Sequence, residues 1–229
     1  MTSRRFSCVL FDLDGTLVDT APDLTGALNH VLAQYQLAPF SVEKVRNTVG
    51  FGARITIERS MSHYNKTLSE EALDIAHAQF LAHYSENICK NSQLFPGVKD
   101  VLEMFKANDI RMSVCTNKTE HLSIDLLDQI GIADYFASIC GSDTVPNKKP
   151  HPDHVFSAIN RAGGKCEEAI LIGDSQADVQ SARAAGIPVI VMSYGYTAVP
   201  SAELGADLVL DSFLDLPKTL ETWPKALEN

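Results

Sequence analysis

The chain alternates short apolar runs with amphipathic stretches, and this alternation restricts the folds that it can adopt. The apolar runs have the length of strands buried on both faces; they are Phe6–Phe11, Ile110–Cys115, Ser138–Cys140, Ala169–Ile172, Pro188–Met192 and Asp207–Leu210. Apolar residues three or four apart predict helices between most of these runs, over Val98–Asn108, Glu120–Ile130, Pro152–Ala162 and Ala177–Ala185. The pattern predicts an α/β fold with a Rossmann-like open parallel sheet and helices on both faces.

One long stretch, from about Thr16 to about Phe95, breaks the alternation and shows no strand pattern. Its apolar residues recur at helical spacing, and Ser41 has the chemistry of a helix N-cap. We interpret this stretch as a helical domain inserted into the α/β fold. The expected division is an α/β core of residues 1–16 and 95–229 and an inserted helical domain of residues 17–94.

Composition and charge exclude several classes of protein. Lys and Arg number 19 against 29 Asp and Glu, and the resulting net charge of −10 opposes nonspecific binding of nucleic acid. No apolar run reaches 18 residues, and Asp12, Asp14 and Asp19 interrupt the first one, so we expect neither a membrane-spanning helix nor a signal peptide. The five cysteines form no Cys-x-x-Cys pair, which favours free thiols in a cytoplasmic protein over disulfides or a zinc site.

The segment Asp12-Leu13-Asp14-Gly15-Thr16 directly follows the first apolar run. In an open α/β sheet, ligands bind beyond the carboxyl ends of the strands, so both carboxylates are candidate site residues. Gly15 permits a sharp turn that presents backbone N–H groups to an anion. Taken alone, the segment also fits an ordinary Asp-Gly turn.

Three more segments follow predicted strands or precede predicted helices. Thr116-Asn117 opens a helix and suits a phosphate contact, although it could also be a simple helix cap. Prolines stiffen Lys148-Lys149-Pro150-His151-Pro152, so a lysine of this segment could face an anionic intermediate; a solvated basic loop is the alternative. In Gly173-Asp174-Ser175-Gln176-Ala177-Asp178, the two aspartates lie one helical turn apart and serve either as site residues or as N-cap residues.

Taken in chain order, the four motifs carry Asp/Asp, Thr, Lys and Asp/Asp, and they resemble those of the haloacid dehalogenase superfamily. The resemblance spans almost the whole chain, and the insertion stands where that superfamily has a helical cap. Within the superfamily, five segments are similar to those of bacterial phosphoglycolate phosphatases: Val49–Ala53, Leu94–Val98, Thr116–Lys118, Asp143–Pro152 and Tyr194–Tyr196. One departure is Thr119, where we expect proline.

The resemblance implies a Mg²⁺-dependent phosphatase that hydrolyses a small phosphate monoester, foremost 2-phosphoglycolate, through an aspartyl-phosphate. It assigns Asp12 as the nucleophile and Asp14 as the general acid and base. The expected phosphate-binding residues are Thr116, Asn117 and Lys149. The expected Mg²⁺ ligands are the carboxylates of Asp12 and Asp174 and the main-chain oxygen of Asp14. Asp178 and Ser175 are expected to support these groups from behind, with Asp178 orienting metal-bound water or Lys149.

The substrate's identity stays more open than the chemistry. Arg54 and Gly52 of the cap are candidate contacts for a substrate carboxylate, although a solvated arginine at a helix start is an alternative. The same motifs serve phosphatases, pyrophosphatases and phosphomutases for other small phosphorylated metabolites. Asp14 argues against dehalogenation, and nothing about Lys44 or Lys66 points to Schiff-base chemistry on a phosphonate. A noncatalytic phosphoacceptor domain would be shorter and lack the insertion. The sequence leaves the oligomeric state open.

Overall fold

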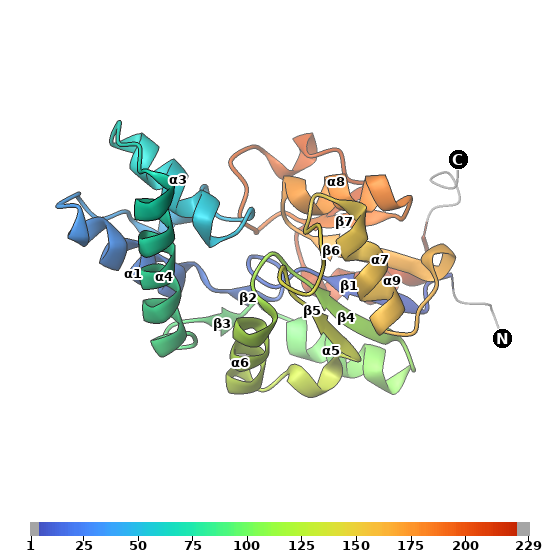
Figure 1. Cartoon of the computed structure of the whole chain (residues 1–229). Helices are drawn as coiled ribbons and strands as arrows, with labels where there is room; N and C mark the ends of the chain where they lie inside the picture. Colours follow the sequence, from blue (N-terminus) through green and yellow to red (C-terminus); the bar gives the residue numbers. More distant parts are fainter. Residues whose placement is uncertain (1–4, 224–229) are drawn as a thin grey trace.

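A six-stranded parallel sheet forms the centre of the computed structural model, which describes residues 5–223 (Figure 1). The strands are β1 (Cys8–Phe11), β4 (Arg111–Cys115), β5 (Ser138–Cys140), β6 (Ala169–Gly173), β7 (Val189–Met192) and β8 (Leu208–Leu210). Their order in the sheet is β5-β4-β1-β6-β7-β8, and every neighbouring pair is parallel. The predicted sheet is confirmed. The chain adds strands first on one side of β1 and then on the other, so the strand order reverses at β1.

Helices cover both faces of the sheet, as Figure 1 shows. One face carries α5 (Val98–Ala107) and α6 (Glu120–Ile130), and the other carries α7 (Pro152–Arg161) and α8 (Gln176–Ala185). Side chains of β1 alternate between the two layers, as the two-residue period of a strand requires. Val9 and Phe11 pack into one buried cluster, and Cys8 and Leu10 pack into the other. A short helix, α9 (Leu216–Glu221), ends the described chain beside α5.

Four helices form a separate body at one end of the sheet, to the left in Figure 1. They are α1 (Ala21–Gln34), α2 (Val42–Arg46), α3 (Ala53–His63) and α4 (Glu70–Glu86), and we call them the cap. Ser41 caps α2, because its hydroxyl accepts a hydrogen bond from the Lys44 backbone N–H at 3.3 Å. The cap packs α1 and α3 against α4, and its buried side chains belong to the same cluster as those on one face of the sheet.

The junctions between the cap and the sheet differ from the sequence prediction, which places no strand there. Two antiparallel strands of two residues each, β2 (Val18–Asp19) and β3 (Gln93–Leu94), pair at this point. They are too short to produce a periodic pattern in the sequence. The Asp23 carboxylate ties the same region together, since it accepts hydrogen bonds from the backbone N–H groups of Asn91 and Ser92 at 2.9 and 2.8 Å. Both connections to the cap are therefore held side by side.

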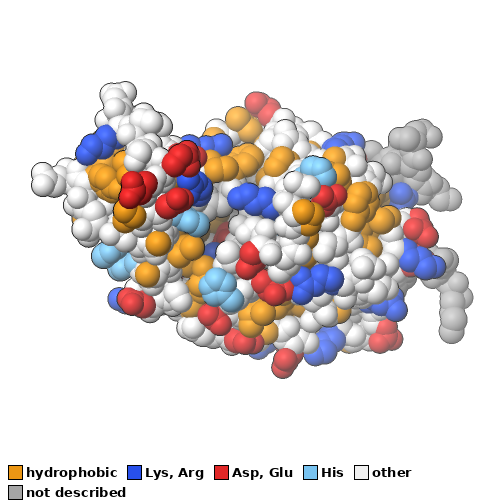
Figure 2. Space-filling model, in the orientation of Figure 1, with side chains coloured by type: hydrophobic (Ala, Val, Ile, Leu, Met, Phe, Trp, Pro, Cys, Tyr) orange, Lys and Arg blue, Asp and Glu red, His pale blue; other side chains and the backbone are white. Residues whose placement is uncertain are grey.

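Acidic and basic side chains are interspersed over the cap and the sheet domain on the face shown in Figure 2. Within residues 5–223, none of the helices has the length and apolar character needed to cross a membrane.

Candidate active site

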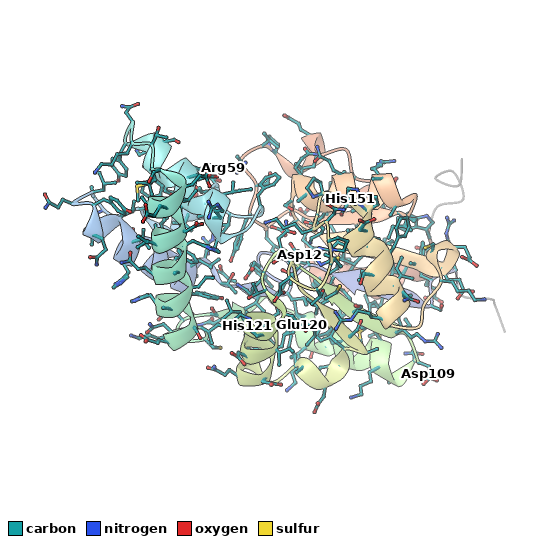
Figure 3. The ribbon with its side chains drawn as sticks, in the orientation of Figure 1. Asp12, Arg59, Asp109, Glu120, His121 and His151 are labelled. Carbon is teal, nitrogen blue, oxygen red and sulfur yellow. The ribbon has the colours of Figure 1, made fainter. Side chains whose placement is uncertain are left out.

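Three strands that lie next to one another each end in a polar site residue. Asp12 follows β1, Thr116 follows β4 and Asp174 follows β6, and all three residues are buried. The register aligns these strand ends, because Phe11 pairs with Val114 on one side and with Ile172 on the other. Figure 3 shows Asp12 at this edge, between the sheet and the cap.

The segment before α7 brings Lys149 into this group of carboxylates. The Lys149 Nζ lies 3.1 Å from the Asp12 Oδ1 and donates to the Asp178 Oδ1 at 2.5 Å. The other Asp178 oxygen accepts hydrogen bonds from the backbone N–H and the hydroxyl of Ser175, at 3.0 and 2.6 Å. Asp178 therefore fixes the position of Lys149 in front of Asp12. The structure thus brings together Lys149 of the third motif and Ser175 and Asp178 of the fourth.

His154 of α7 fixes the backbone of the same lysine. Its Nδ1 accepts a hydrogen bond from the Lys149 N–H at 3.3 Å, and its Nε2 lies 2.9 Å from the Cys140 carbonyl oxygen. A neutral ring that donates from Nε2 satisfies both contacts. Burial, together with the charge of Lys149, lowers the pKa of His154 to about 4 and keeps the ring neutral.

The carboxylates of this group are strongly desolvated. Burial raises the pKa of Asp12 to about 7, with the charges of Asp178 and Asp14 adding to the shift and that of Lys149 opposing it. Burial and the neighbouring charges of Asp12 and Asp178 raise the pKa of Asp174 well above its usual range. Burial alone would lower the pKa of Lys149, but Asp12 and Asp178 raise it. The lysine is charged, and one ammonium faces several carboxylates.

This excess of negative charge fits a bound cation. Oxygen atoms of Asp12, Asp174 and Asp178 lie within 4.8 Å of one another, and all three side chains are buried. An all-oxygen donor set suits a hard divalent cation, and a positive charge would offset the repulsion among these carboxylates and favour their ionised forms. The residues present therefore fit a metal of the magnesium type.

Two glycines make room for the side chain of Asp174. Gly15 has φ +88°, and a Cβ on it would lie 2.3 Å from the Asp174 Oδ2. A Cβ on Gly195 would lie 2.0 Å from the Asp174 Cβ. The Asp174 oxygens accept hydrogen bonds from the Thr16 hydroxyl at 2.9 Å and from the Tyr196 N–H at 2.6 Å. Two loops thus hold this carboxylate beside the Asp12 segment.

Asp14 has partners that sequence reasoning missed. Its Oδ1 accepts a hydrogen bond from the Thr20 hydroxyl at 2.6 Å and lies 3.0 Å from the Nζ of Lys118. The same ammonium donates to the Tyr84 hydroxyl of the cap at 3.0 Å. Burial alone would lower the pKa of Lys118, but the Asp14 charge raises it. Lys118 belongs to the Thr116-Asn117-Lys118 turn, so the sequence motif could have pointed to it as a site residue. No motif marks Tyr84.

A cavity of about 240 Å³ lies between the sheet edge and the cap. The core contributes Asp12, Asp14, Thr116, Asn117, Lys118, Thr119, Leu122, Ser142 and Lys148 to its wall. The cap contributes Leu24, Val49, Gly50, Gly52, Ala53, Arg54, Thr56, His77, Phe80, Leu81 and Tyr84. Both candidate catalytic carboxylates therefore open into a space that the cap closes.

Comparison with known families agrees with this geometry. Residues 9–192 match the model of the haloacid dehalogenase-like hydrolase family. The chain belongs to that family. Its four predicted motifs lie at one edge of the family's sheet, and the cap helices follow the first motif.

Individual members of the family are similar over nearly the full chain. Phosphoglycolate phosphatase of Caulobacter vibrioides is 44% identical over 93% of this chain and 90% of its own length. Phosphoglycolate phosphatase of Agrobacterium fabrum is 41% identical over 96% of this chain and 95% of its own length. A crystal structure described as a predicted phosphoglycolate phosphatase from Haemophilus somnus superposes with a TM-score of 0.86 at 33% identity, covering 93% of this chain and 97% of that one.

The remaining predicted site residues lie around the cavity with different partners. Asn117 donates from Nδ2 to the carbonyl oxygens of Gly50 at 3.2 Å and Lys149 at 3.1 Å, while its Oδ1 is buried without a partner in the described part of the chain. It therefore links the core to the cap loop. Arg54 lines the cavity, and its guanidinium pairs with Glu70 at 2.6 Å and with Asp74. Asp74 foremost raises the pKa of Arg54.

Proposed function

We propose that this chain is a Mg²⁺-dependent phosphatase that hydrolyses 2-phosphoglycolate to glycolate and phosphate through an aspartyl-phosphate on Asp12. The observation that carries the proposal is the placement of Asp12, which lies 3.1 Å from the buried Lys149 ammonium and opens with Asp14 into the cavity under the cap. The names of the similar phosphoglycolate phosphatases support the choice of substrate. The carboxylate pair supports the chemistry independently of those names.

In the first step, a carboxylate oxygen of Asp12 attacks the phosphorus and the bond to the glycolate oxygen breaks. Asp14, in its protonated form, gives its proton to that leaving oxygen. Lys149 and the Thr116 hydroxyl hold the phosphoryl oxygens, and the lysine charge offsets the repulsion between a carboxylate and a phosphate dianion. Asp178 keeps the Lys149 ammonium aimed at Asp12 throughout.

In the second step, Asp14 takes a proton from a water molecule whose oxygen attacks the same phosphorus. The bond between phosphorus and the Asp12 oxygen breaks, which releases phosphate and restores both carboxyl groups to their starting states. One residue thus acts first as an acid and then as a base. The Lys118 ammonium and the Thr20 hydroxyl orient Asp14 for both roles.

The carboxylates of Asp12 and Asp174 and the main-chain oxygen of Asp14 are the proposed ligands of Mg²⁺. When bound, the ion offsets the negative charge of the phosphate and the carboxylates. The close contacts of Gly15 and Gly195 with Asp174 support its place in this set.

The test is phosphate release from a panel that contains 2-phosphoglycolate, pyrophosphate and hexose phosphates. We expect the highest kcat/KM for 2-phosphoglycolate with Mg²⁺ and no turnover after chelation with EDTA. Preference for pyrophosphate or a hexose phosphate would replace the substrate but keep the chemistry. A stable phosphoprotein without turnover would refute the phosphatase proposal altogether.

We place this activity in the cytoplasm, as the cysteine pattern predicts. All five cysteines lie within the described residues as free thiols, and Cys8, Cys115 and Cys140 are buried. Burial raises the pKa of Cys8 to about 11, which keeps its thiol protonated and unreactive. Fractionation of cells that express the protein tests this location.

A further inference from the structure

The cations that line the cavity differ in what already neutralises them. Arg54 pairs with two carboxylates of α4, Glu70 and Asp74. Lys118 pairs with Asp14 and donates to the Tyr84 hydroxyl. Both are therefore committed to protein groups on the wall of the cavity.

His77, which also lines the cavity, does not supply a positive charge. Burial, together with the nearby charge of Arg54, lowers the pKa of His77 below its usual value. Its ring is therefore mainly neutral at physiological pH.

Lys148 is different. Its Nζ donates to the backbone carbonyl oxygen of Phe51 at 3.2 Å, and no carboxylate of the described chain pairs with it. An ammonium carries three donors, so two remain for a ligand. The side chain is half-buried, and burial lowers the pKa of Lys148. A half-buried cation without a counter-ion is unfavourable, and an anionic ligand would stabilise it.

The cap loop passes directly over this ammonium. Gly52 has φ +99°, a conformation that favours glycine, and a Cβ there would lie 3.1 Å from the Lys148 Nζ. Asn117 holds the same loop through the Gly50 carbonyl at 3.2 Å. Core and cap therefore enclose the lysine head together at the wall of the cavity.

The geometry points to Lys148 as the residue that binds the carboxylate of the substrate's leaving group. The inference rests on the proposed function, because it needs a leaving group with a negative charge. Lys148 and Lys149 are consecutive, yet Lys149 faces Asp12 and Asp178 while Lys148 faces the cap loop. Two neighbouring lysines thus divide the substrate, with Lys149 at the phosphoryl end and Lys148 at the carboxylate end.

The experiment compares 2-phosphoglycolate with 2-hydroxyethyl phosphate, which replaces the carboxylate by an uncharged CH₂OH group. In Lys148→Met, we expect kcat/KM for 2-phosphoglycolate to fall roughly 10- to 150-fold, the value of a charge-assisted contact. For 2-hydroxyethyl phosphate we expect a change of less than about threefold, because that substrate offers no charge to lose. Lys148→Arg keeps a cation and should retain more activity on 2-phosphoglycolate than Lys148→Met.

Lys106→Met is the matched control, because the Nζ of Lys106 also donates to one backbone carbonyl, that of Asp134, at 2.9 Å and outside the cavity. It should leave both substrates unchanged. Equal losses on the two substrates in Lys148→Met would overturn the inference, since they would show that Lys148 only anchors the cap loop. No loss on 2-phosphoglycolate, or an arginine variant no better than methionine, would also overturn it. Lys148→Gln serves as a second uncharged variant. A thermal unfolding curve for every variant shows whether a loss of activity comes from a folding defect.

Failure of the proposed function has a separate signature. It appears in the unaltered enzyme as a lack of preference for 2-phosphoglycolate over the other substrates. Failure of this inference appears only in the comparison between the variants.

Discussion

The two walls of the cavity are built in different ways. On the core side, Asp12 lines the cavity, and Lys149, Asp174 and Asp178 lie buried around it. Lys149 pairs with Asp12 and Asp178, and the Tyr196 N–H donates to Asp174. On the cap wall, the loop around Gly52 is half-buried, and the polar contacts reach it across the gap from side chains of the core. The core wall is a preformed charged network, whereas the position of the cap loop depends on a few contacts.

This difference suggests that the reacting groups and the contacts that discriminate among substrates lie in different parts of the cavity. A network that is already oriented stabilises charge in a transition state without reorganising, so the reacting groups belong on the core wall. The cap joins the core through two adjacent connections at β2 and β3, which could absorb a hinge motion that admits substrate and releases product. Changes in the buried charged network around Asp12 should therefore alter the rate for every substrate, and changes at the contacts between the core and the cap loop should alter the choice among substrates.

The largest effect is expected for Asp12→Asn. The amide has the shape of the carboxylate but is no nucleophile, so turnover should fall by more than about 10⁴-fold on every substrate. Stability should stay the same or rise, because burial raises the pKa of Asp12 and the folded state disfavours its charge. Phosphate release and thermal unfolding measure the two effects. Substantial activity with normal Mg²⁺ dependence would rule out the aspartyl-phosphate.

Asp14→Asn should have the next largest effect. One carboxyl serves both steps, and loss of general acid–base help lowers rates by roughly 10²–10⁴-fold. The first step should suffer less with p-nitrophenyl phosphate, whose leaving group needs little protonation. The check is kcat on both substrates, with burst kinetics to separate the steps. A loss below about tenfold on 2-phosphoglycolate would assign the proton transfers to another group.

The contrast between the walls also explains what the sequence could predict. Asp12, Thr116 and Asp174 each follow a strand directly, and neighbouring parallel strands end at one edge, so local sequence sufficed to place them. The contact between Lys118 and Tyr84 depends on how the cap helix α4 lies against a core turn, and no local pattern encodes that. Arg54 likewise finds its partners on another cap helix.

A smaller effect, on stability, should come from the core histidine that supports Lys149. Burial lowers the pKa of His154 to about 4 from an ordinary value of 6.5, so the unfolded chain binds a proton that the folded chain does not. The contribution of neutral His154 to the free energy of unfolding is therefore complete above pH 6.5. It is lost as the pH falls toward 4, by about 3 kcal/mol in total.

Urea unfolding of the wild type and of His154→Asn between pH 4 and 7.5 measures this loss. Protonation of buried Asp12 acts in the opposite direction, so the difference between the two proteins isolates the histidine. His121 is exposed on α6, and His121→Asn should keep the wild-type slope. Identical slopes in wild type and His154→Asn would mean that His154 is not held neutral.

The smallest effect is expected for Arg54→Ala, which tests whether this cationic side chain of the cap also contributes to the choice of substrate. Its guanidinium already pairs with Glu70 and Asp74 at the exposed end of the cavity. Exposed ion pairs contribute little, so KM should change by less than about threefold, and by the same factor for 2-phosphoglycolate and 2-hydroxyethyl phosphate. Lys148→Met, measured beside it, should separate the two substrates. If Arg54→Ala instead raised KM only for 2-phosphoglycolate, the carboxylate contact would belong to the cap helix, and the division of the substrate between two consecutive core lysines would be wrong.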